Sequence, residues 1–538
     1  MRDQFSNTQQ IRKPAVTSRG GIVAAQSRQA AEVGAGVLAA GGDCVDAVIA
    51  TTFALGVLEP WMSGLGGGGA MVLYRAREDR YHVIDYGMRA PLSLRLEDYP
   101  LTGGAASDLF PWARVKDDRN LHGPGAIAVP GVVAGMEEAH RRYAKMPWNE
   151  LLAPSVALAG QGLAVDWWTT LMIANSAADL RRYPASATAY LLDGLPPNAP
   201  WGIKSSVRMP QDRLNATMAH LAAQGPRDFY EGDLARSLAA DVRAAGGALS
   251  VEDLMPFKAH SREPLAIPYR GGQVFATPEL TAGPTLARTL QLLQQNLQPA
   301  RGGPDPAAYI ACAEALQTAC RERLKDMGDA DGRRALGAEH LAPACTTHFS
   351  AVDRDGNMAA VTQTLLSAFG SKFVCPQTGI TMNNGIMWFD PTPGTPNSLA
   401  PGKRCLTNYT PVLAQTADGR RLSVGASGGR RILPAVTQLL SFVMDYDMDL
   451  DAAIHQPRID ASEGAVVIGD RRLPMAAREA LRARFDYEEA LIQTLPMKFA
   501  CPSMVLRDGA TNSGATEPFQ PWSEAVSEAF ATARATAG

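Results

Sequence analysis

Cysteine and histidine are sparse in this sequence. Seven cysteines are spread over 538 residues without a Cys-x-x-Cys pair, and the eight histidines form no His-x-x-x-His pair. These absences argue against a disulfide framework and against a zinc site. We therefore expect neither a metal nor another cofactor, and we predict a reducing compartment, the cytoplasm, as the location of the protein.

An excess of charge of one sign and a long apolar run are also lacking. With 51 basic and 54 acidic residues the net charge is −3, so no positive field attracts nucleic acid or an anionic membrane. The most apolar stretch, residues 47–58, is too short to span a bilayer, which takes about 20 residues. The polar first 19 residues show no secretory signal.

The spacing of apolar residues changes along the chain. At roughly 150 residues per domain its length corresponds to three or four domains. Apolar spacing near 3.6 residues marks the middle of the chain, and a period of two marks its ends. Helices are predicted at 43–58, with Asp43 as N-cap, and at 133–143, 148–160, 233–245, 283–294, 306–326 and 434–445. Strands are predicted at 70–75, 81–87, 348–352, 359–365, 379–383, 411–415 and 421–427. This order predicts a layered α/β sandwich whose sheets combine distant parts of the chain.

A glycine run at residues 64–69, interrupted only by Leu65, follows the first of these helices. A dinucleotide-binding loop needs the order strand, glycine turn, helix, whereas here the helix comes first and a strand follows. We therefore favour a turn in which backbone segments approach closely. A nucleotide-binding oxidoreductase is a distant alternative that depends on this run alone.

Two alternating segments flank turn-forming residues at 353–357, which predicts a β-hairpin. If the turn centres on Asp355, residues whose numbers add up to 710 face each other, and Thr346 lies opposite Thr364, about 5 Å away. A threonine can use its own α-amino group as the base that activates its hydroxyl, once the preceding peptide bond is cut. The alternative is that both threonines are ordinary strand residues.

The segment TTHFSAVDRDGN, which begins at Thr346, resembles the processing site of the γ-glutamyltransferase family, N-terminal nucleophile hydrolases with a four-layer αββα fold. Similar segments extend over nearly the whole chain, at residues 29–69, 129–140, 229–254, 283–293, 401–413, 423–432 and 448–460. The resemblance implies one αββα unit in place of several domains. It also implies self-cleavage into a large chain, 1–345, and a small chain, 346–538, which stay associated.

In this family the proenzyme cleaves itself before the first threonine of the motif, here the bond between Cys345 and Thr346. The resemblance implies that Thr346 is the nucleophile and that Thr364 is a second active-site threonine. It implies further that the backbone N–H groups of Gly428 and Gly429 form the oxyanion hole. Preorganised donors of this kind stabilise a tetrahedral intermediate by about 3 to 4 kcal/mol each.

The substrate pocket departs from the family pattern. Gly87 stands where γ-glutamyl enzymes carry the arginine for the substrate α-carboxylate, and Trp388 stands where they carry an acidic residue. Thr407 and Asn408 replace a serine pair, and Leu366 replaces an asparagine. A missing guanidinium removes a bidentate, charge-assisted contact. These changes argue against glutathione as the preferred substrate.

Six residues are therefore candidates for substrate binding: Arg89, Asn384, Trp388, Thr407, Asn408 and Arg430. A structural role for the two arginines, or a core role for Trp388, is an equally valid interpretation. The departures resemble the branch of the family that contains oxamate amidohydrolase-like and acylase-like members.

The predicted function is a self-processing threonine amidohydrolase that cleaves a small oxamate-like or N-acyl amide. One alternative is a glutathione hydrolase or γ-glutamyltransferase with an altered carboxylate clamp. Others are a cephalosporin or glutaryl-type acylase, and a catalytically silent member that binds a small ligand. The expected partner is a small amide, with neither nucleic acid nor membrane, and the two-chain unit is expected to form a dimer.

Overall fold

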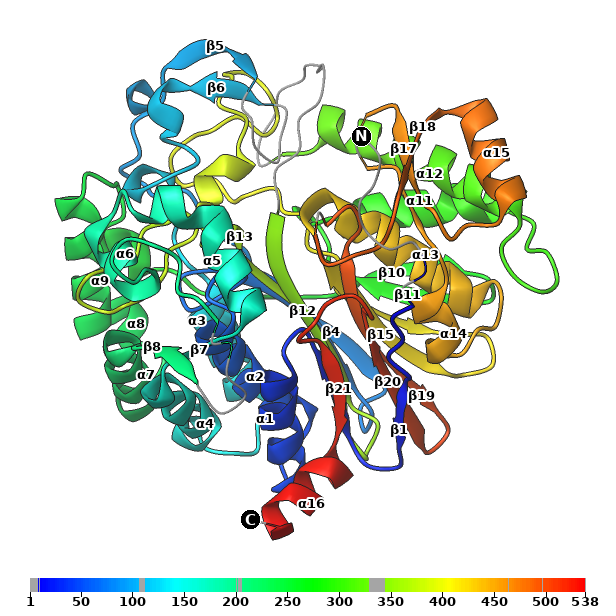
Figure 1. Ribbon diagram of the computed structural model, residues 1–538, viewed down its shortest axis with the longest axis horizontal. Helices are drawn as coiled ribbons and strands as arrows, with labels where there is room; N and C mark the ends of the chain where they lie inside the picture. The colour runs from blue at the N-terminus through cyan, green and yellow to red at the C-terminus, as the bar shows by residue number, and fades with distance from the viewer. Residues whose placement is uncertain are drawn as a thin grey trace.

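Two seven-stranded antiparallel sheets lie face to face at the centre of the molecule, and helices cover the outer face of each (Figure 1). The computed structural model describes residues 8, 10–105, 112–199, 201, 206–328, 344–462, 464–495 and 497–537, and the statements below concern these residues. The predicted four-layer αββα sandwich is confirmed.

The first sheet carries the predicted hairpin at its centre. Its strands, in spatial order, are β21 (Glu524–Ser527), β2 (Ile22–Ala25), β12 (Ala344–Val352), β13 (Met358–Ser367), β3 (Gly68–Arg75), β4 (Arg80–Tyr86) and β9 (His260–Arg262). The second sheet consists of β1 (Val16–Ser18), β20 (Thr511–Thr516), β19 (Cys501–Asp508), β15 (Arg421–Ser427), β14 (Val412–Gln415), β11 (Gly272–Ala276) and β10 (Leu265–Tyr269).

Each sheet buries one face against helices and the other against its partner sheet, because successive side chains of a strand point to opposite faces. In β12, Phe349 and Ala351 pack on the helices, whereas Val352 packs between the sheets. The helices over the first sheet are α1 (Arg28–Ala39), α2 (Cys44–Leu58), α3 (Val132–Tyr143), α4 (Trp148–Gln161), α7 (Asp212–Gln224), α8 (Asp228–Glu231), α9 (Asp233–Ala244) and α10 (Val251–Leu254). Those over the second sheet are α11 (Gly283–Asn296), α12 (Pro306–Asp326), α13 (Ile432–Met444), α14 (Leu450–His455) and α15 (Met475–Arg484).

Smaller elements surround this sandwich. They are β5 (Leu101–Ala105), β6 (Ala113–Val115), β7 (Leu163–Val165), β8 (Val207–Met209), β16 (Ile459–Asp460), β17 (Val466–Asp470), β18 (Asp486–Ala490), α5 (Trp167–Leu180), α6 (Pro184–Tyr190), α16 (Glu528–Ala537) and the 3₁₀ turns η1 (Leu96–Asp98), η2 (Lys116–Asp118), η3 (Pro124–Ala126), η4 (Gly385–Trp388) and η5 (Gly429–Arg431). Across the described part of the chain, no helix combines the length and the apolar character that crossing a bilayer requires.

The helix predicted at 43–58 is α2, and its start has the predicted cap. Asp43 Oδ1 accepts a hydrogen bond from the Val45 N–H at 2.8 Å, and Asp46 Oδ2 accepts one from the Asp43 N–H at 2.9 Å. This reciprocal capping box satisfies backbone donors that a helix start otherwise leaves unpaired. Every residue of α2 is buried, as its uniformly apolar sequence predicts.

The predicted hairpin and its register are also confirmed. From Thr347 and Gln363 to Val352 and Met358, the paired residue numbers add up to 710. At the turn, the Asp353 carboxylate accepts hydrogen bonds from the Asn357 N–H at 2.9 Å and from Asn357 Nδ2 at 2.7 Å. The hairpin therefore depends on a local contact between two turn residues.

Several segments differ from the prediction. The strand expected at 379–383 is absent, and this segment makes isolated bridges such as Gly66 with Met382. The amide of Asn383 bonds the backbone of Gly66 and Ala128 and so competes with a strand ladder. The sequence prediction also treated residues 130–340 as helical and missed β9, β10 and β11, which are short and include Pro268.

The glycine run forms the close backbone approach that the sequence predicts. It leads into β3, whose neighbour is β13. A Cβ atom on Gly67 would lie 2.4 Å from the carbonyl oxygen of Thr364, and one on Gly69 would lie 2.5 Å from that of Thr362. Real Cβ atoms do not approach an oxygen so closely, so a larger residue here would push β13 away.

We expect Gly67→Ala to destabilise the protein by about 1–3 kcal/mol, because the added methyl group overpacks against the Thr364 backbone. A lowered melting temperature in thermal unfolding is the expected result. Gly36→Ala is the matched control, since a Cβ atom at this position in α1 meets no atom within 4 Å. That change is expected to stabilise the protein by about 0.5–1 kcal/mol through helix propensity. Equal melting temperatures for both variants would contradict the role of Gly67.

Candidate active site

Thr346 and Thr364 are in direct contact at the start of β12. Thr346 Oγ1 donates a hydrogen bond to Thr364 Oγ1 at 3.2 Å, and both side chains are buried. Thr364 Oγ1 in turn donates to the carbonyl oxygen of Cys345, the residue before the predicted nucleophile. A chain of hydroxyl groups therefore leads from Thr346 to the carbonyl of the predicted scissile bond.

A β-bulge produces this arrangement. The register of the hairpin shifts between Thr347 and Cys345, and Cys345 pairs with Leu366. Thr364 and Leu365 therefore both face Thr346, an irregularity that the sequence does not reveal. Leu366 has a φ of 89°, a conformation that costs a residue with a Cβ atom about 1–3 kcal/mol.

Asn384, a predicted substrate-binding residue, holds the bulge in place. Its Oδ1 accepts a hydrogen bond from the Ser367 N–H at 3.0 Å, and its Nδ2 donates to the carbonyl of Leu121 at 3.1 Å. Its backbone N–H donates to the carbonyl of Leu365 at 3.1 Å. These contacts give Asn384 a clear supporting role, and its contact with substrate stays a prediction.

The predicted oxyanion donors lie at the end of β15. Gly428 has a φ of 136° and Gly429 a φ of 60°, so both positions favour glycine. Gly429 begins η5, which packs against β12 and leads into α13. The first N–H groups of a helix have no partner within it and can bind an anion. The assignment of these two N–H groups to the oxyanion hole stays a prediction.

The other predicted pocket residues divide between two cavities. Arg89 and Thr407 line a cavity of about 370 Å³, together with Gly87, Asp85 and Arg404. Asp85 lies 4.0 Å from Arg404, and burial raises the pKa of this carboxyl group. This is the cavity beside the glycine that replaces the family arginine.

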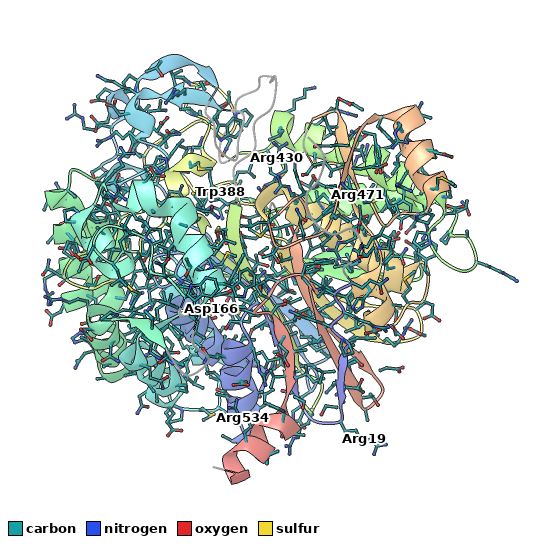
Figure 2. The ribbon with its side chains drawn as sticks, viewed as in Figure 1. Arg19, Asp166, Trp388, Arg430, Arg471 and Arg534 are labelled. Carbon is teal, nitrogen blue, oxygen red and sulfur yellow. The ribbon has the colours of Figure 1, made fainter. Side chains whose placement is uncertain are left out.

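Trp388, Asn408 and Arg430 line a second cavity of about 30 Å³, here called the Trp388 cavity. Figure 2 shows Trp388 and Arg430 next to each other in the upper part of the molecule. Arg323 lines the same cavity. Its location was not predicted, because nothing in an α12 sequence with several arginines indicates which one turns inward.

Glu59 is a second residue that the sequence analysis passed over. Its side chain is 0% exposed, and neither carboxylate oxygen has a hydrogen-bond partner among the described residues. Burial raises its pKa to about 8, against a smaller lowering by the nearby Thr347 hydroxyl. The sequence signal for this site was the position of Glu59, an acidic residue between the apolar helix α2 and the glycine run. Glu59 is thus mainly protonated at neutral pH, and it lies near Thr347, the residue that follows the predicted nucleophile.

His348 links the two sheets through hydroxyl groups. Its Nδ1 lies 2.9 Å from Thr362 Oγ1 and its Nε2 lies 3.1 Å from Ser350 Oγ. Ser423 Oγ, on the second sheet, donates to Ser350 Oγ at 2.8 Å. Burial lowers the pKa of His348 to about 3, so the ring is neutral at physiological pH and serves as a fixed bridge.

A cluster of possible metal ligands lies elsewhere, in the outer helices. His220, Asp228 and Asp233 offer ligand atoms within 4.8 Å of one another. The Asp228 carboxylate already accepts hydrogen bonds from the N–H groups of Asp233 and Leu234, each at 3.1 Å. Its geometry is that of a helix cap.

Comparison with known proteins identifies relatives over most of the chain. Residues 30–345 and 333–526 match the family model described as gamma-glutamyltranspeptidase. The chain is 33% identical over 501 residues to the acylase ACY 1 proenzyme of Pseudomonas sp. (strain V22), with 88% of each chain covered. It is 29% identical over 493 residues to the glutathione hydrolase proenzyme of Bacillus subtilis (strain 168), covering 82% of this chain and 80% of that one.

The structure is similar to the crystal structure of cephalosporin acylase from Bacillus halodurans. The TM-score is 0.83 at 24% sequence identity, and 98% of this chain and 99% of that chain are covered. At this level of identity the similarity establishes the fold.

Replacement of Thr364 by Ala is expected to slow cleavage before Thr346 roughly 100- to 1000-fold, because it removes the hydroxyl that donates to the Cys345 carbonyl. Thr364→Ser retains the hydroxyl and is expected to cleave at a rate within about tenfold of the wild type. A time course on denaturing gels measures both rates. Cleavage of the Ala variant at the wild-type rate would remove Thr364 from the processing step.

Glu59 is expected to make stability depend on pH. The pKa of Glu59 is about 8 in the folded protein and 4.5 for the free side chain. The contribution of Glu59 to the free energy of unfolding is therefore fully present below pH 4.5 and is lost as the pH rises to about 8. Glu59→Gln removes this loss. Thermal melts at pH 5 and pH 8 measure the effect. Relative to the wild type, the free energy of unfolding of the variant should be higher by up to a few kcal/mol at pH 8 than at pH 5. The exposed Glu150→Gln is the matched control, and identical pH profiles for the two variants would contradict the burial effect.

Proposed function

Because this chain belongs to the gamma-glutamyltranspeptidase (γ-glutamyltransferase) family, and is therefore a hydrolase of amide bonds, we propose that Thr346 is its nucleophile and that it activates itself by cleavage. The observation that carries this proposal is the 3.2 Å contact between Thr346 Oγ1 and Thr364 Oγ1, beside the Cys345 carbonyl. The names of both sequence relatives include the word proenzyme, which supports a processed chain.

Self-cleavage uses the carbonyl of Cys345 as its first substrate. Thr346 Oγ1 attacks the carbonyl carbon, and its proton passes to the Thr346 nitrogen as the C–N bond breaks. The Thr364 hydroxyl donates to the oxygen on which negative charge develops. The product is an ester between Cys345 and Thr346. Water hydrolyses it and leaves a Cys345 carboxylate, a free Thr346 hydroxyl and a free α-amino group.

Turnover repeats the same chemistry on an external amide. The new α-amino group, with a reference pKa near 8, accepts the proton of Thr346 Oγ1 as the hydroxyl attacks the substrate carbonyl. The N–H groups of Gly428 and Gly429 bind the oxyanion, and the proton passes to the leaving amine. Water then hydrolyses the acyl-enzyme and releases the acid.

The substrate we favour is a small N-acyl or oxamate-like amide. Gly87 offers no guanidinium to the 370 Å³ cavity, and Trp388 offers no carboxylate to the Trp388 cavity, so a free amino acid headgroup loses both of its charged contacts. The 33% identity to an acylase proenzyme supports the acylase alternative, including a cephalosporin or glutaryl-type substrate.

Hydrolysis or transfer of a γ-glutamyl group is the second candidate. Arg89 and Arg404 line the cavity beside Gly87 and offer positive charge where the family arginine is missing. The identity to a glutathione hydrolase proenzyme supports this candidate as well. A silent, ligand-binding member would retain the fold without the cleavage.

The proposal also covers the association of the two chains and the location of the protein. The chains 1–345 and 346–538 stay together after cleavage, because each sheet contains strands from both. We retain a dimer of this two-chain unit and a cytoplasmic location as proposals from the sequence.

Intact-mass measurement of the purified protein is expected to show two chains, the smaller starting at Thr346. Thr346→Ala should remain one chain of 57.2 kDa without activity, whereas Thr346→Ser should still cleave. Oxamate, a γ-glutamyl anilide and a glutaryl amide then separate the candidate substrates. Full turnover by the Ala variant would show that another residue is the nucleophile, and an uncut wild-type chain without activity would support a silent member.

A further inference from the structure

Glu59 and three neighbours form a closed ring of contacts beside the strand of the proposed nucleophile. The Glu59 carbonyl accepts a hydrogen bond from the Ser63 N–H at 3.3 Å, and Ser63 Oγ accepts one from Gln363 Nε2 at 3.3 Å. Gln363 pairs with Thr347 across the hairpin, and the Thr347 hydroxyl lies near the Glu59 carboxyl group. All four side chains are fully buried, and together they are called the Glu59 ring.

The Glu59 ring lies on the face of the first sheet that the helices cover. Successive side chains of a strand point to opposite faces, and Phe349 and Val361 pack on the helices. Thr347 and Gln363 are each two residues away from one of them, so they point to the same face. Helix α2 packs on both strands there, and Glu59 is the residue that ends it. The acid therefore meets the two strand residues directly under the hairpin.

The ring has oxygen atoms that need a donor. Both carboxylate oxygens of Glu59, Thr347 Oγ1 and Gln363 Oε1 have no hydrogen-bond partner among the described residues. An ionised carboxylate only accepts hydrogen bonds, whereas a protonated one also donates. A proton on Glu59 therefore allows the carboxyl, hydroxyl and amide groups to bond one another, which matters because an unpaired polar group is costly when it is buried.

Within the described part of the chain, the neighbours of Glu59 carry no charge that would offset its ionisation. The other ring residues are uncharged amide and hydroxyl side chains. Cys501, the first residue of β19, lies near Glu59, and burial raises the pKa of its thiol to about 12. His348, on β12, is neutral as well. With the pKa of Glu59 raised to about 8 by burial, the surroundings favour the neutral acid.

The Glu59 ring contacts the segments of both active-site threonines. Thr347 directly follows Thr346 in β12, so a fixed Thr347 side chain also fixes the backbone beside the nucleophile. The turn inside the ring bonds the bulged strand, because the Met62 carbonyl accepts a hydrogen bond from the Leu365 N–H at 3.1 Å. Leu365 directly follows Thr364 in β13. One buried acid is thus connected to both strands that meet at the site.

We propose that Glu59, as a neutral acid, is a positioning residue for Thr346 and Thr364. Its proton keeps the Glu59 ring bonded, and loss of that proton puts an unpaired charge under the hairpin and loosens the hold on Thr347. This role rests on the proposed function, in which Thr346 attacks the Cys345 carbonyl. Self-cleavage then depends on the protonated form of Glu59.

Self-cleavage of newly made precursor tests this role without an external substrate. The protein is made by cell-free translation and shifted to buffers of pH 7 and pH 9, and cleavage is followed on denaturing gels. Glu59→Gln keeps a neutral side chain of the same shape and should cleave at a rate similar to the wild type at pH 7. The ratio of wild-type to Gln rates should fall about tenfold between pH 7 and pH 9, since a pKa near 8 leaves about one tenth of Glu59 protonated at pH 9.

Two further variants test the connection through Thr347. Glu59→Met removes the polar group and should slow cleavage at both pH values, roughly 5- to 150-fold. Thr347→Val should slow it as well and add little to Glu59→Met, because both changes act on one ring. Thr51→Val is the matched control, a buried threonine of α2 whose hydroxyl bonds the Ala47 carbonyl at 2.8 Å and faces Gly34 of α1. It should leave the ratio unchanged.

The protonation of Glu59 can also be measured directly. The infrared band of a protonated carboxyl group should be present in the wild type at pH 7 and absent from Glu59→Gln. An equal wild-type to Gln ratio at pH 7 and pH 9, or full-rate cleavage by Glu59→Met, would overturn the positioning role and leave the proposed function intact. A precursor that stays intact at both pH values would contradict the proposed function, and the infrared band would then decide whether the neutral acid exists. If Glu59→Met fails to fold, the wild type and the Gln variant still decide.

Discussion

The hydroxyl group of Thr364 is the contact on which the geometry of the site depends. It accepts hydrogen bonds from Thr346 Oγ1 and from the Leu366 N–H, at 3.2 and 2.8 Å, and it donates to the carbonyl of Cys345. A regular hairpin would not place one hydroxyl between a side chain and the preceding carbonyl. The bulge does so at the expense of backbone strain at Leu366, and the surrounding segments offset that strain. Asn384 and the Met62 carbonyl bond the bulged residues, and the glycines lie against the backbone of β13.

Burial between two helical layers sets the electrostatics of this region. His348 and Glu59 are both fully buried, and their pKa values shift toward their neutral forms. Arg323, with its pKa lowered to about 10, is a buried group that stays charged at neutral pH. In a medium of low polarity, the few charges that remain act over a longer range than in water. Fixed hydrogen-bond donors around an oxyanion in this region would therefore act with little screening.

Much of this architecture was predictable because the deciding interactions are local. The register of the hairpin follows from its turn, where Asp353 bonds Asn357, and α2 follows from its cap. The irregular parts depend on contacts between distant segments. The bulge at Thr364 needs Met62 and Asn384, and the inward turn of Arg323 needs carbonyl groups of two other segments. Strands β10 and β11 are stabilised by pairing with each other and with β14, which hydrophobic period alone does not reveal.

The interleaving of the two proposed chains, 1–345 and 346–538, has a consequence for the lifetime of a cleaved protein. β2 lies between β21 and β12, and β11 pairs with β14, so segments from both sides of residue 345 alternate within each sheet. While the chain is continuous, a strand that opens is held close to its partner by the covalent backbone. After cleavage, complete unfolding yields two separate polypeptides whose reassembly depends on concentration. The cut protein is thus maintained by the height of its unfolding barrier, a kinetic form of stability that the folded precursor establishes before the bond is broken.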